Sequence, residues 1–439
     1  MHPEKLKLKK RYIGVFSLNY FTQGIVQSNF TTIIPIYLLQ LIGTVDAGKI
    51  ASIMSLVLLP FGIKFIYGML SDKFGFKNIG RRKPWIIGPS IISGLLWVFL
   101  TFILTPSNAM TMVLVLGVFI VIGVAMADTA IDGLILDLYP KERLGRVQGI
   151  CWGFRSVGII AGGPLLVVFI LLAGGIIEYA FIGLGIAMII FSFAIIIVKE
   201  FKKSIEINIT DNLKVIFGKA KNWKVYVFSL FNSMVDGVIF LFIPLFILIQ
   251  WGMVGAIGAS IDLIGDPTRE DLYAPNALSA FIIGLGVIIG ALIGGRMADL
   301  QSRKRSVYIS LLITTISFLL FLIPVIWSIL IFFAFLLGGA AGWKNSAFSA
   351  VIAQESQLYP DYDATYYATC NSFTNLGATI GLELTSILFA GLVGLPTFAI
   401  YAIIFLFMAI LINIDFIPFL TMDPNEYEIN PIEKKSKLS

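Results

Sequence analysis

The sequence predicts an all-α membrane protein whose twelve transmembrane helices form two related bundles of six. Three observations predict this fold. Apolar residues make up 58% of the 439 residues and charged residues only 13%, long uncharged runs recur along the chain, and blocks of the first half return in the second half in the same order. Soluble domains carry about twice that share of charge. The composition therefore favours a lipid bilayer over water as the surroundings of this chain.

The uncharged runs each reach or exceed the roughly 20 residues that cross about 30 Å of hydrocarbon. Turn sequences such as Thr105–Asn108 and Gly394–Pro396 divide the longer runs. The resulting helices are expected near residues 12–40, 48–70, 85–105, 109–138, 147–174, 178–198, 223–251, 276–298, 306–325, 327–354, 364–391 and 394–419. Backbone exposed to lipid has no hydrogen-bond partner, and the alternation typical of a membrane barrel is absent, so these segments should be helices.

Basic residues set the expected orientation. All but five of the 32 Lys and Arg residues lie at the N-terminus, in the loops that follow even-numbered helices, or in the C-terminal tail. Lys49 and Arg269 lie on the other side, and Lys64, Arg155 and Lys344 lie within helices. The positive-inside rule then places both termini in the cytoplasm, in a protein that crosses the cell membrane many times. The net charge of +6 reflects this topology, and we expect no nucleic-acid partner.

The two halves repeat. Val15–Leu18 recurs as Val227–Leu230, Gly68 and Asp72 recur as Gly295 and Asp299, and Cys151, Gly158 and Gly162 recur as Cys370, Gly377 and Gly381. The matches keep their order, as a duplicated six-helix unit would. We expect an N-terminal bundle over residues 1–198, a cytoplasmic linker over 199–222, a C-terminal bundle over 223–420 and a cytoplasmic tail over 421–439.

The loop after the second helix carries a recognisable motif. Gly68-Met-Leu-Ser-Asp72-Lys-Phe-Gly75, followed by Gly80-Arg81-Arg82-Lys83, resembles the cytoplasmic loop motif of the major facilitator superfamily, and Asp299 belongs to a reduced second copy. The resemblance implies the major facilitator fold and secondary active transport by alternating access. Gly68, Asp72, Arg81, Arg82 and Asp299 are then gating residues, in which glycine allows close helix approach and the acid pairs with Arg or caps a helix.

Residues 55 to 165 suggest a subfamily. Leu59-Pro-Phe-Gly-Ile-Lys64, the paired acids of Ala127-Asp-Thr-Ala-Ile-Asp-Gly133 and the segment Gly153-Phe-Arg155 are similar to the muropeptide permease and acetyl-coenzyme A transporter group. Cation-coupled sugar symporters of the glycoside type share the basic loop but use carboxylates in helix 2, where this chain has Lys64. That class stays an alternative, as does a membrane assembly or receptor protein on the same fold.

Charges inside the membrane indicate where function resides, because each costs a few kcal/mol unless it is paired or hydrated. Lys64, Asp132 and Arg155 come out at similar depths, about 10, 12 and 13 Å from the cytoplasmic ends of their helices. Asp128 and Asp132 stand four residues apart and share a helix face, where one carboxylate can carry a proton. The expected substrate or coupling residues are Lys64, Asp128, Asp132, Arg155, Asp236, Lys344, Asn19 and Gln23.

A structural interpretation competes with this one. Lys64 could reach the membrane interface, and Asp132 and Arg155 could form a permanent ion pair between helices. The repeat favours function, because the positions that match Lys64 and Arg155 in the second half are uncharged. The hypothesis is that Lys64, Arg155 and Lys344 attract an anionic solute while Asp128, Asp132 or Asp236 takes up a proton.

The remaining features indicate a transporter rather than an enzyme. The single histidine is His2, and the sequence shows no metal-ligand cluster, nucleophile motif or phosphate-binding loop. We expect no cofactor and no metal, a small-molecule solute with a proton or another coupling ion as partners, and a monomer. Cys151 and Cys370 fit buried, free thiols.

Overall fold

The computed structural model describes residues 10–75, 80–139, 141–172, 174, 176–200, 214, 216–265, 270–359 and 363–428. Most of the expected linker 199–222 and the end of the expected tail 421–439 lie outside these residues. The chain forms two compact units, the first from Met1–Ile42 and Leu56–Ile209 and the second from Gly43–Ser55 and Thr210–Ser439.

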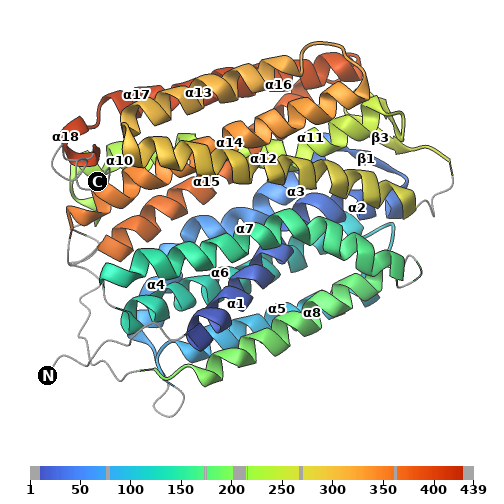
Figure 1. Cartoon of the computed structure of the whole chain (residues 1–439). Coiled ribbons are helices and arrows are strands. Elements are labelled where there is room, and N and C mark those ends of the chain that lie inside the picture. Colours follow the sequence, from blue (N-terminus) through green and yellow to red (C-terminus); the bar gives the residue numbers. More distant parts are fainter. Residues whose placement is uncertain are drawn as a thin grey trace, which may run out of the picture. The chain divides into compact units, whose positions relative to one another are not determined.

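Unit 1 is built from helices, and two of its spans are broken (Figure 1). The first span comprises α1 (Lys10–Ser28), a π-helical turn η1 (Asn29–Ile33) and α2 (Ile34–Ile42). The second span comprises α3 (Ala47–Leu58), a 3₁₀ turn η2 (Leu59–Ile63) and α4 (Lys64–Lys73). The residues of α3 up to Ser55 belong to unit 2, and the span is part of unit 1 from Leu56 onward. Its other helices are α5 (Lys83–Ile103), α6 (Ala109–Leu138), α7 (Lys141–Leu172), α8 (Ile177–Phe193) and the 3₁₀ turn η3 (Ala194–Ile197).

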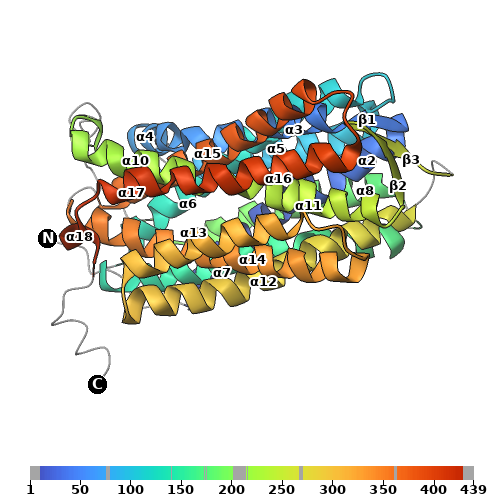
Figure 2. The ribbon, with the colours of Figure 1, turned by 90° about the horizontal axis from the view of Figure 1, so that it is seen from above.

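Unit 2 repeats this plan and adds a small sheet. Its helices are α10 (Ala220–Asn232), α11 (Asp236–Gln250), η4 (Glu270–Leu272), α12 (Tyr273–Leu300), α13 (Arg303–Leu320), α14 (Trp327–Gln357), α15 (Asp363–Gly391), α16 (Thr397–Ile414), α17 (Phe416–Leu420) and α18 (Pro424–Tyr427). The strands β1 (Thr44–Asp46), β2 (Val254–Ile257) and β3 (Ser260–Leu263) form an antiparallel sheet in the order β1-β3-β2. The sheet and α18 lie at opposite ends of unit 2 (Figures 1 and 2).

Among the described residues, 11 helical segments are long and apolar enough to cross a membrane. The helix α13 is outside that set because its first turn carries Arg303, Lys304 and Arg305, yet its side chains Leu312 and Ile316 are about half exposed. Large apolar side chains are exposed on many other helices, including Phe102 at 74%. A soluble protein rarely exposes apolar surface on this scale, and a lipid environment accounts for it. The expected all-α membrane fold is therefore confirmed.

The breaks within spans differ from the continuous helices expected over 12–40, 48–70 and 223–251. Helix 7 divides into α10 and α11 at Ser233–Val235, and helix 2 changes to a 3₁₀ turn where Pro60 removes a backbone donor. Hydropathy reports how apolar a window is and carries no information on the hydrogen-bond register within it, so these breaks are not visible in a hydropathy pattern. Irregular turns within long helices frequently mark functional positions.

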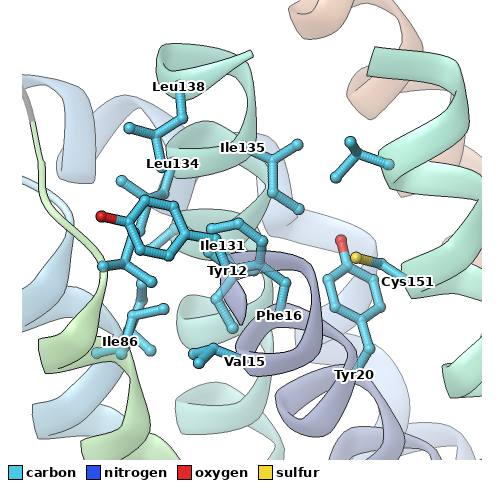
Figure 3. Packing of buried hydrophobic residues seen from close by; sticks show 14 of the residues in the cluster. Tyr12, Val15, Phe16, Tyr20, Ile86, Ile131, Leu134, Ile135, Leu138 and Cys151 are labelled. Carbon is cyan, nitrogen blue, oxygen red and sulfur yellow. The ribbon is translucent and has the colours of Figure 1, made fainter. Parts of the chain in front are cut away.

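The core of unit 1 surrounds the first half of α1. Figure 3 shows Tyr12, Phe16 and Tyr20 of α1 packed with Ile131 and Leu134 of α6. The hydroxyl of Tyr20 points toward the thiol of Cys151 on α7 in the same view. Cys151 also lies against Ser17, as Cys370 lies against Ser229 in unit 2. The same Ser–Cys contact therefore occurs within each half, at equivalent positions.

Glycines allow the closest helix pairs. A Cβ atom added to Gly377 would overlap the backbone carbonyl of Leu230, and one added to Gly158 would overlap that of Phe21. These contacts join the fifth helix of each unit to the first. Both glycines belong to the repeated block expected from sequence, so helix packing explains why they recur.

We predict that Gly290→Val lowers the stability of unit 2. A Cβ atom at Gly290 of α12 would overlap the carbonyl oxygen of Gly339 on α14, so the two helices must separate, at a cost of about 1–3 kcal/mol or more. Thermal unfolding of the purified protein in detergent would measure the loss. Gly391→Ala is the matched control, because nothing lies within 4 Å of a Cβ atom there. Equal unfolding temperatures for the two variants would contradict the packing argument.

Candidate functional site

Two cations and one carboxylate meet inside unit 1. Lys64 begins α4, Asp128 lies on α6, and Arg155 lies on α7. The ammonium of Lys64 donates to Oδ2 of Asp128, and Nη1 of Arg155 lies 3.4 Å from the same oxygen. The three side chains are at most 8% exposed. The structure thus brings three of the expected charges together, at the point where the second span changes from a 3₁₀ turn to an α-helix.

Phe61 supports both cations. Its ring centroid lies 4.9 Å from Nζ of Lys64 and 5.5 Å from Cζ of Arg155, within the range in which an aromatic face attracts a cation. Phe61 belongs to the 3₁₀ turn η2, with Pro60 and Gly62 beside it. This local conformation brings the ring of Phe61 and the ammonium of Lys64, three residues later, close to each other.

Asp132 has a different partner from Asp128. Tyr20 of α1 donates its hydroxyl to Oδ1 of Asp132, and Nη2 of Arg155 lies 3.4 Å from Oε1 of Gln27 on the same helix. The ion pair considered from sequence between Asp132 and Arg155 is therefore replaced by one between Asp128 and Arg155. Sequence reasoning missed Tyr20 because a tyrosine in an apolar helix gives no signal until its neighbours are known.

Asn19 and Gln23 line a small pocket within unit 1. They share it with Ser90 of α5, Ala127 of α6 and Met188 of α8, and the cavity volume is about 20 Å³. The Asn19 amide donates to the carbonyl oxygens of Val15 at 2.9 Å and Phe191 at 3.3 Å. This volume suits one water molecule, so Asn19 and Gln23 of α1 face the interior of the bundle.

Unit 2 holds a second charged group. Lys344 of α14 donates to Oδ1 of Asp236 at 2.8 Å and to the backbone carbonyl of Asn232. Asp236 is the first residue of α11, where the helix dipole favours a carboxylate, and the Asn345 amide lies 3.5 Å from its second oxygen. The Lys344 side chain is 1% exposed and that of Asp236 is 17% exposed. The break between α10 and α11 thus coincides with an ion pair.

The predicted gating residues form a network at one end of unit 1. Asp137 at the end of α6 lies 2.6 Å from Nη2 of Arg81 and 3.3 Å from Nε of Arg82, and Nη1 of Arg82 donates to Ser71 at 2.7 Å. The backbone N–H groups of Arg81 and Arg82 both donate to Glu200, at 2.9 and 2.7 Å. Asp137 and Glu200 are therefore the partners of the basic loop, and sequence reasoning identified neither.

The remaining predicted gating residues are Gly68, Asp72 and Asp299. A Cβ atom on Gly68 would lie 3.2 Å from Thr129 of α6, which fits the expected close helix approach. The Asp72 side chain lies outside the described part of the structure, and Asp299 is exposed.

Unit 2 repeats the network with an amide in place of one acid. Glu428 accepts hydrogen bonds from the backbone N–H groups of Arg303 and Lys304, at 3.2 and 2.8 Å, as Glu200 does at the start of α5. Nη1 of Arg303 donates to Gln354 of α14 at 2.9 Å, where Arg82 meets Asp137 in unit 1. Glu200 thus caps the start of α5, and Glu428 caps the start of α13. Each of these acids follows the last helix of its unit.

Chemically, the two groups of buried charges can bind ions and move protons within the helix bundles. The unit 1 cluster of Lys64, Arg155, Asp128 and Asp132 has two cations and two carboxylates, and Asp128 contacts both cations. The unit 2 group has Lys344 and Asp236 as a direct pair.

The sequence and the fold are both similar to those of known membrane transporters. The sequence profile described as the Major Facilitator Superfamily matches residues 16–265 and 246–437. A protein of Rickettsia conorii named as the transporter AmpG 1 is 24% identical over 347 residues, which cover 75% of this chain and 80% of that protein. The solved nucleoside transporter NupG superposes with a TM-score of 0.68 at 13% identity, covering 93% of this chain and 100% of that chain. A D-xylose–proton symporter gives 0.63 at 16% identity, covering 91% and 97%. At these identities the two solved structures show the shared fold alone.

Proposed function

We propose that this chain, which belongs to the Major Facilitator Superfamily, carries a small anionic organic solute across the membrane together with a proton, by alternating access. It is a membrane transporter and not an enzyme. The observation that carries the proposal is the convergence of Lys64 and Arg155 on one oxygen of Asp128 within the buried interior of unit 1. Muropeptides, suggested by the subfamily resemblance, are the first solutes to test.

Charge balance connects the solute to the proton. With both carboxylates ionised, the unit 1 cluster is neutral. Asp132 is held by the neutral Tyr20 hydroxyl, whereas Asp128 is held by two cations. A proton therefore costs less on Asp132 than on Asp128, because both cations contact Asp128 directly. Protonation of Asp132 leaves the cluster with an excess positive charge, which attracts an anion.

This linkage is reciprocal. If a proton on Asp132 strengthens anion binding, a bound anion strengthens proton binding by the same factor. A solute that arrives with its proton is thus favoured over either alone, which is the thermodynamic requirement for symport. In unit 2, Lys344 provides another buried cation, which is paired with Asp236. The orientation with both termini in the cytoplasm, the linker between bundles and the monomeric state are part of the same proposal.

We predict that Lys64→Ala and Asp132→Asn both reduce uptake, by different routes. Uptake of labelled anionic solutes into proteoliposomes, with and without an imposed pH gradient, measures both effects. Lys64→Ala should lower uptake at least about tenfold, because loss of a charge-assisted contact costs about 1.5–3 kcal/mol. Asp132→Asn keeps the positive excess permanently and should bind solute while losing the response to the pH gradient.

Matched variants separate these effects from general damage. Lys49→Ala removes an exposed lysine and Asp262→Asn an acid on strand β3, so both should transport like the unmodified protein. The proposal fails if Lys64→Ala takes up anionic solutes normally, or if uptake ignores the pH gradient in the unmodified protein. Uptake of neutral sugars in preference to anions would support the glycoside symporter alternative.

A further inference from the structure

The carboxyl group of Asp415 is buried, and no residue in the described part of the chain donates a hydrogen bond to it. It occupies the turn between α16 and α17, and its backbone N–H donates to the Ile412 carbonyl at 3.3 Å. The side chain is fully buried, and neither carboxyl oxygen has a hydrogen-bond partner among the described residues. An ionised carboxylate in such a place costs several kcal/mol even after relaxation of the protein. This group therefore requires a source of stabilisation.

The helices on both sides of Asp415, α16 and α17, pack against α10, which ends at Asn232. The buried cation that contacts this end of α10 is Lys344. Its ammonium is already committed, however, to Oδ1 of Asp236 at 2.8 Å and to the Asn232 carbonyl. Among the described residues, Asp236 thus contacts Lys344 and Asp415 does not. Asp236 is also partly exposed, at the start of a helix and near the Asn345 amide.

Unit 1 and unit 2 differ in the partners that they offer to their buried acids. There, Lys64 and Arg155 balance Asp128 and Asp132, and Tyr20 donates to the second acid. In unit 2 the second acid, Asp415, has neither a cation in contact nor a hydrogen-bond donor among the residues that the structure describes. A buried carboxyl group with this environment is stable as the neutral acid, because protonation removes the charge that the site cannot solvate.

We propose that Asp415 is a proton-binding site, and that Lys344 pairs with whichever of Asp236 and Asp415 is ionised. The three groups then hold one proton between two carboxyl groups. The structure shows Lys344 in contact with Asp236, and in this arrangement the proposal places the proton on Asp415. When Asp236 takes a proton from water, Lys344 is released to Asp415, which ionises and gives one proton to water. The total number of protons on the three groups is unchanged.

The assignment of a proton to Asp415 depends on the proposed function only for the role of that proton in transport. Proton coupling was assigned there to Asp132 of unit 1, whereas Asp415 adds a second titrating position in unit 2. Strongly interacting acids titrate as a pair, so Asp236 and Asp415 should release their protons in two linked steps. The test below needs no solute, so it can succeed or fail independently of transport.

Infrared spectroscopy of the purified full-length protein in lipid nanodiscs tests the proposal. A protonated carboxyl group in an apolar site has a carbonyl stretch separate from that of a carboxylate. This band should be present in the unmodified protein at neutral pH, lost in Asp415→Asn and retained in the control Asp262→Asn. An unchanged band in Asp415→Asn would overturn the assignment.

Two further measurements cover the remaining outcomes. Asparagine mimics the neutral acid, so Asp415→Asn should unfold at nearly the same temperature as the unmodified protein. If Asp415→Asn does not fold, Asp415→Glu retains an acid and should move the band to a new frequency, whereas an unmoved band would refute the assignment. Sodium chloride, compared with potassium chloride, should have no specific effect on stability. A sodium effect lost in Asp415→Asn would assign the carboxylate to a metal cation and overturn the proton site.

Discussion

Asp128→Asn should cause the largest loss of stability of any single substitution in unit 1, by about 3–5 kcal/mol, and should abolish transport. Asp128 is fully buried and is the contact of both Lys64 and Arg155. Removing one partner of a buried ion pair leaves its counter-charge uncompensated, which is the source of this cost. Here one substitution leaves two cations without their carboxylate. Thermal unfolding in detergent, together with uptake into proteoliposomes, would measure both effects.

A second substitution should recover stability without activity. Asp128→Asn combined with Lys64→Met removes one of the two stranded cations, so the double variant should be more stable than Asp128→Asn alone. Transport should remain absent, because the cation pair is gone. Asp262→Asn is the control for loss of an acid at the surface of a strand. Normal stability of Asp128→Asn would show that the contacts in this cluster contribute little to the fold.

In unit 2, Lys344→Met should lower the stability by about 3–5 kcal/mol, a loss similar to that expected for Asp128→Asn. The substitution preserves most of the side-chain volume and removes the ammonium from a place where its side chain is only 1% exposed. Asp236 would keep the Asn345 amide at 3.5 Å and lose its only ion pair in the described part of the chain. Lys221→Met is the matched control, because Lys221 pairs with Glu426 with side chains 44% and 32% exposed. Such surface pairs contribute about 1 kcal/mol or less.

A second substitution, added to Lys344→Met, distinguishes the roles of Asp236 and Asp415. If Asp236 is the ionised partner, Asp236→Asn should restore much of the stability lost in Lys344→Met. If Asp415 is already neutral, Asp415→Asn should restore little. Equal rescue by both substitutions would mean that Lys344 neutralises both carboxylates at once. Unfolding temperatures of the two double variants are sufficient to decide.

The sequence predicted the class, the helices and part of the charge cluster. Hydropathy identified the spans because a bilayer requires long apolar segments, and the basic loop carried the family signature. The depth estimate grouped Lys64, Asp132 and Arg155, since a rise of about 1.5 Å per residue converts position into height. Two of these residues, Lys64 and Arg155, contact the same carboxylate, that of Asp128. Spacing also placed Asp128 and Asp132 on one helix face.

Partner identity could not be predicted in the same way. The spacing of Asp128 and Asp132 says nothing of which acid meets Arg155, because that depends on how α6 and α7 are rotated against each other. Tyr20, Asp137 and Glu200 were missed for the same reason. Asp415 was missed because an acid near the end of a helix is usually at the membrane interface, where it needs no special account. The three-stranded sheet joins short segments that are far apart in sequence and too brief for a pattern.

The capping acids have a practical consequence for how the end of this chain is used. All the membrane-crossing helices are complete at Leu420, and a protein engineer could choose that residue to attach a fluorescent reporter. Glu428 nevertheless closes the start of α13, and Tyr427 accepts a hydrogen bond from Arg303 at 2.6 Å. A fusion made before Glu428 would open the beginning of a helix more than a hundred residues upstream. The junction should therefore follow Glu428, where the described structure ends.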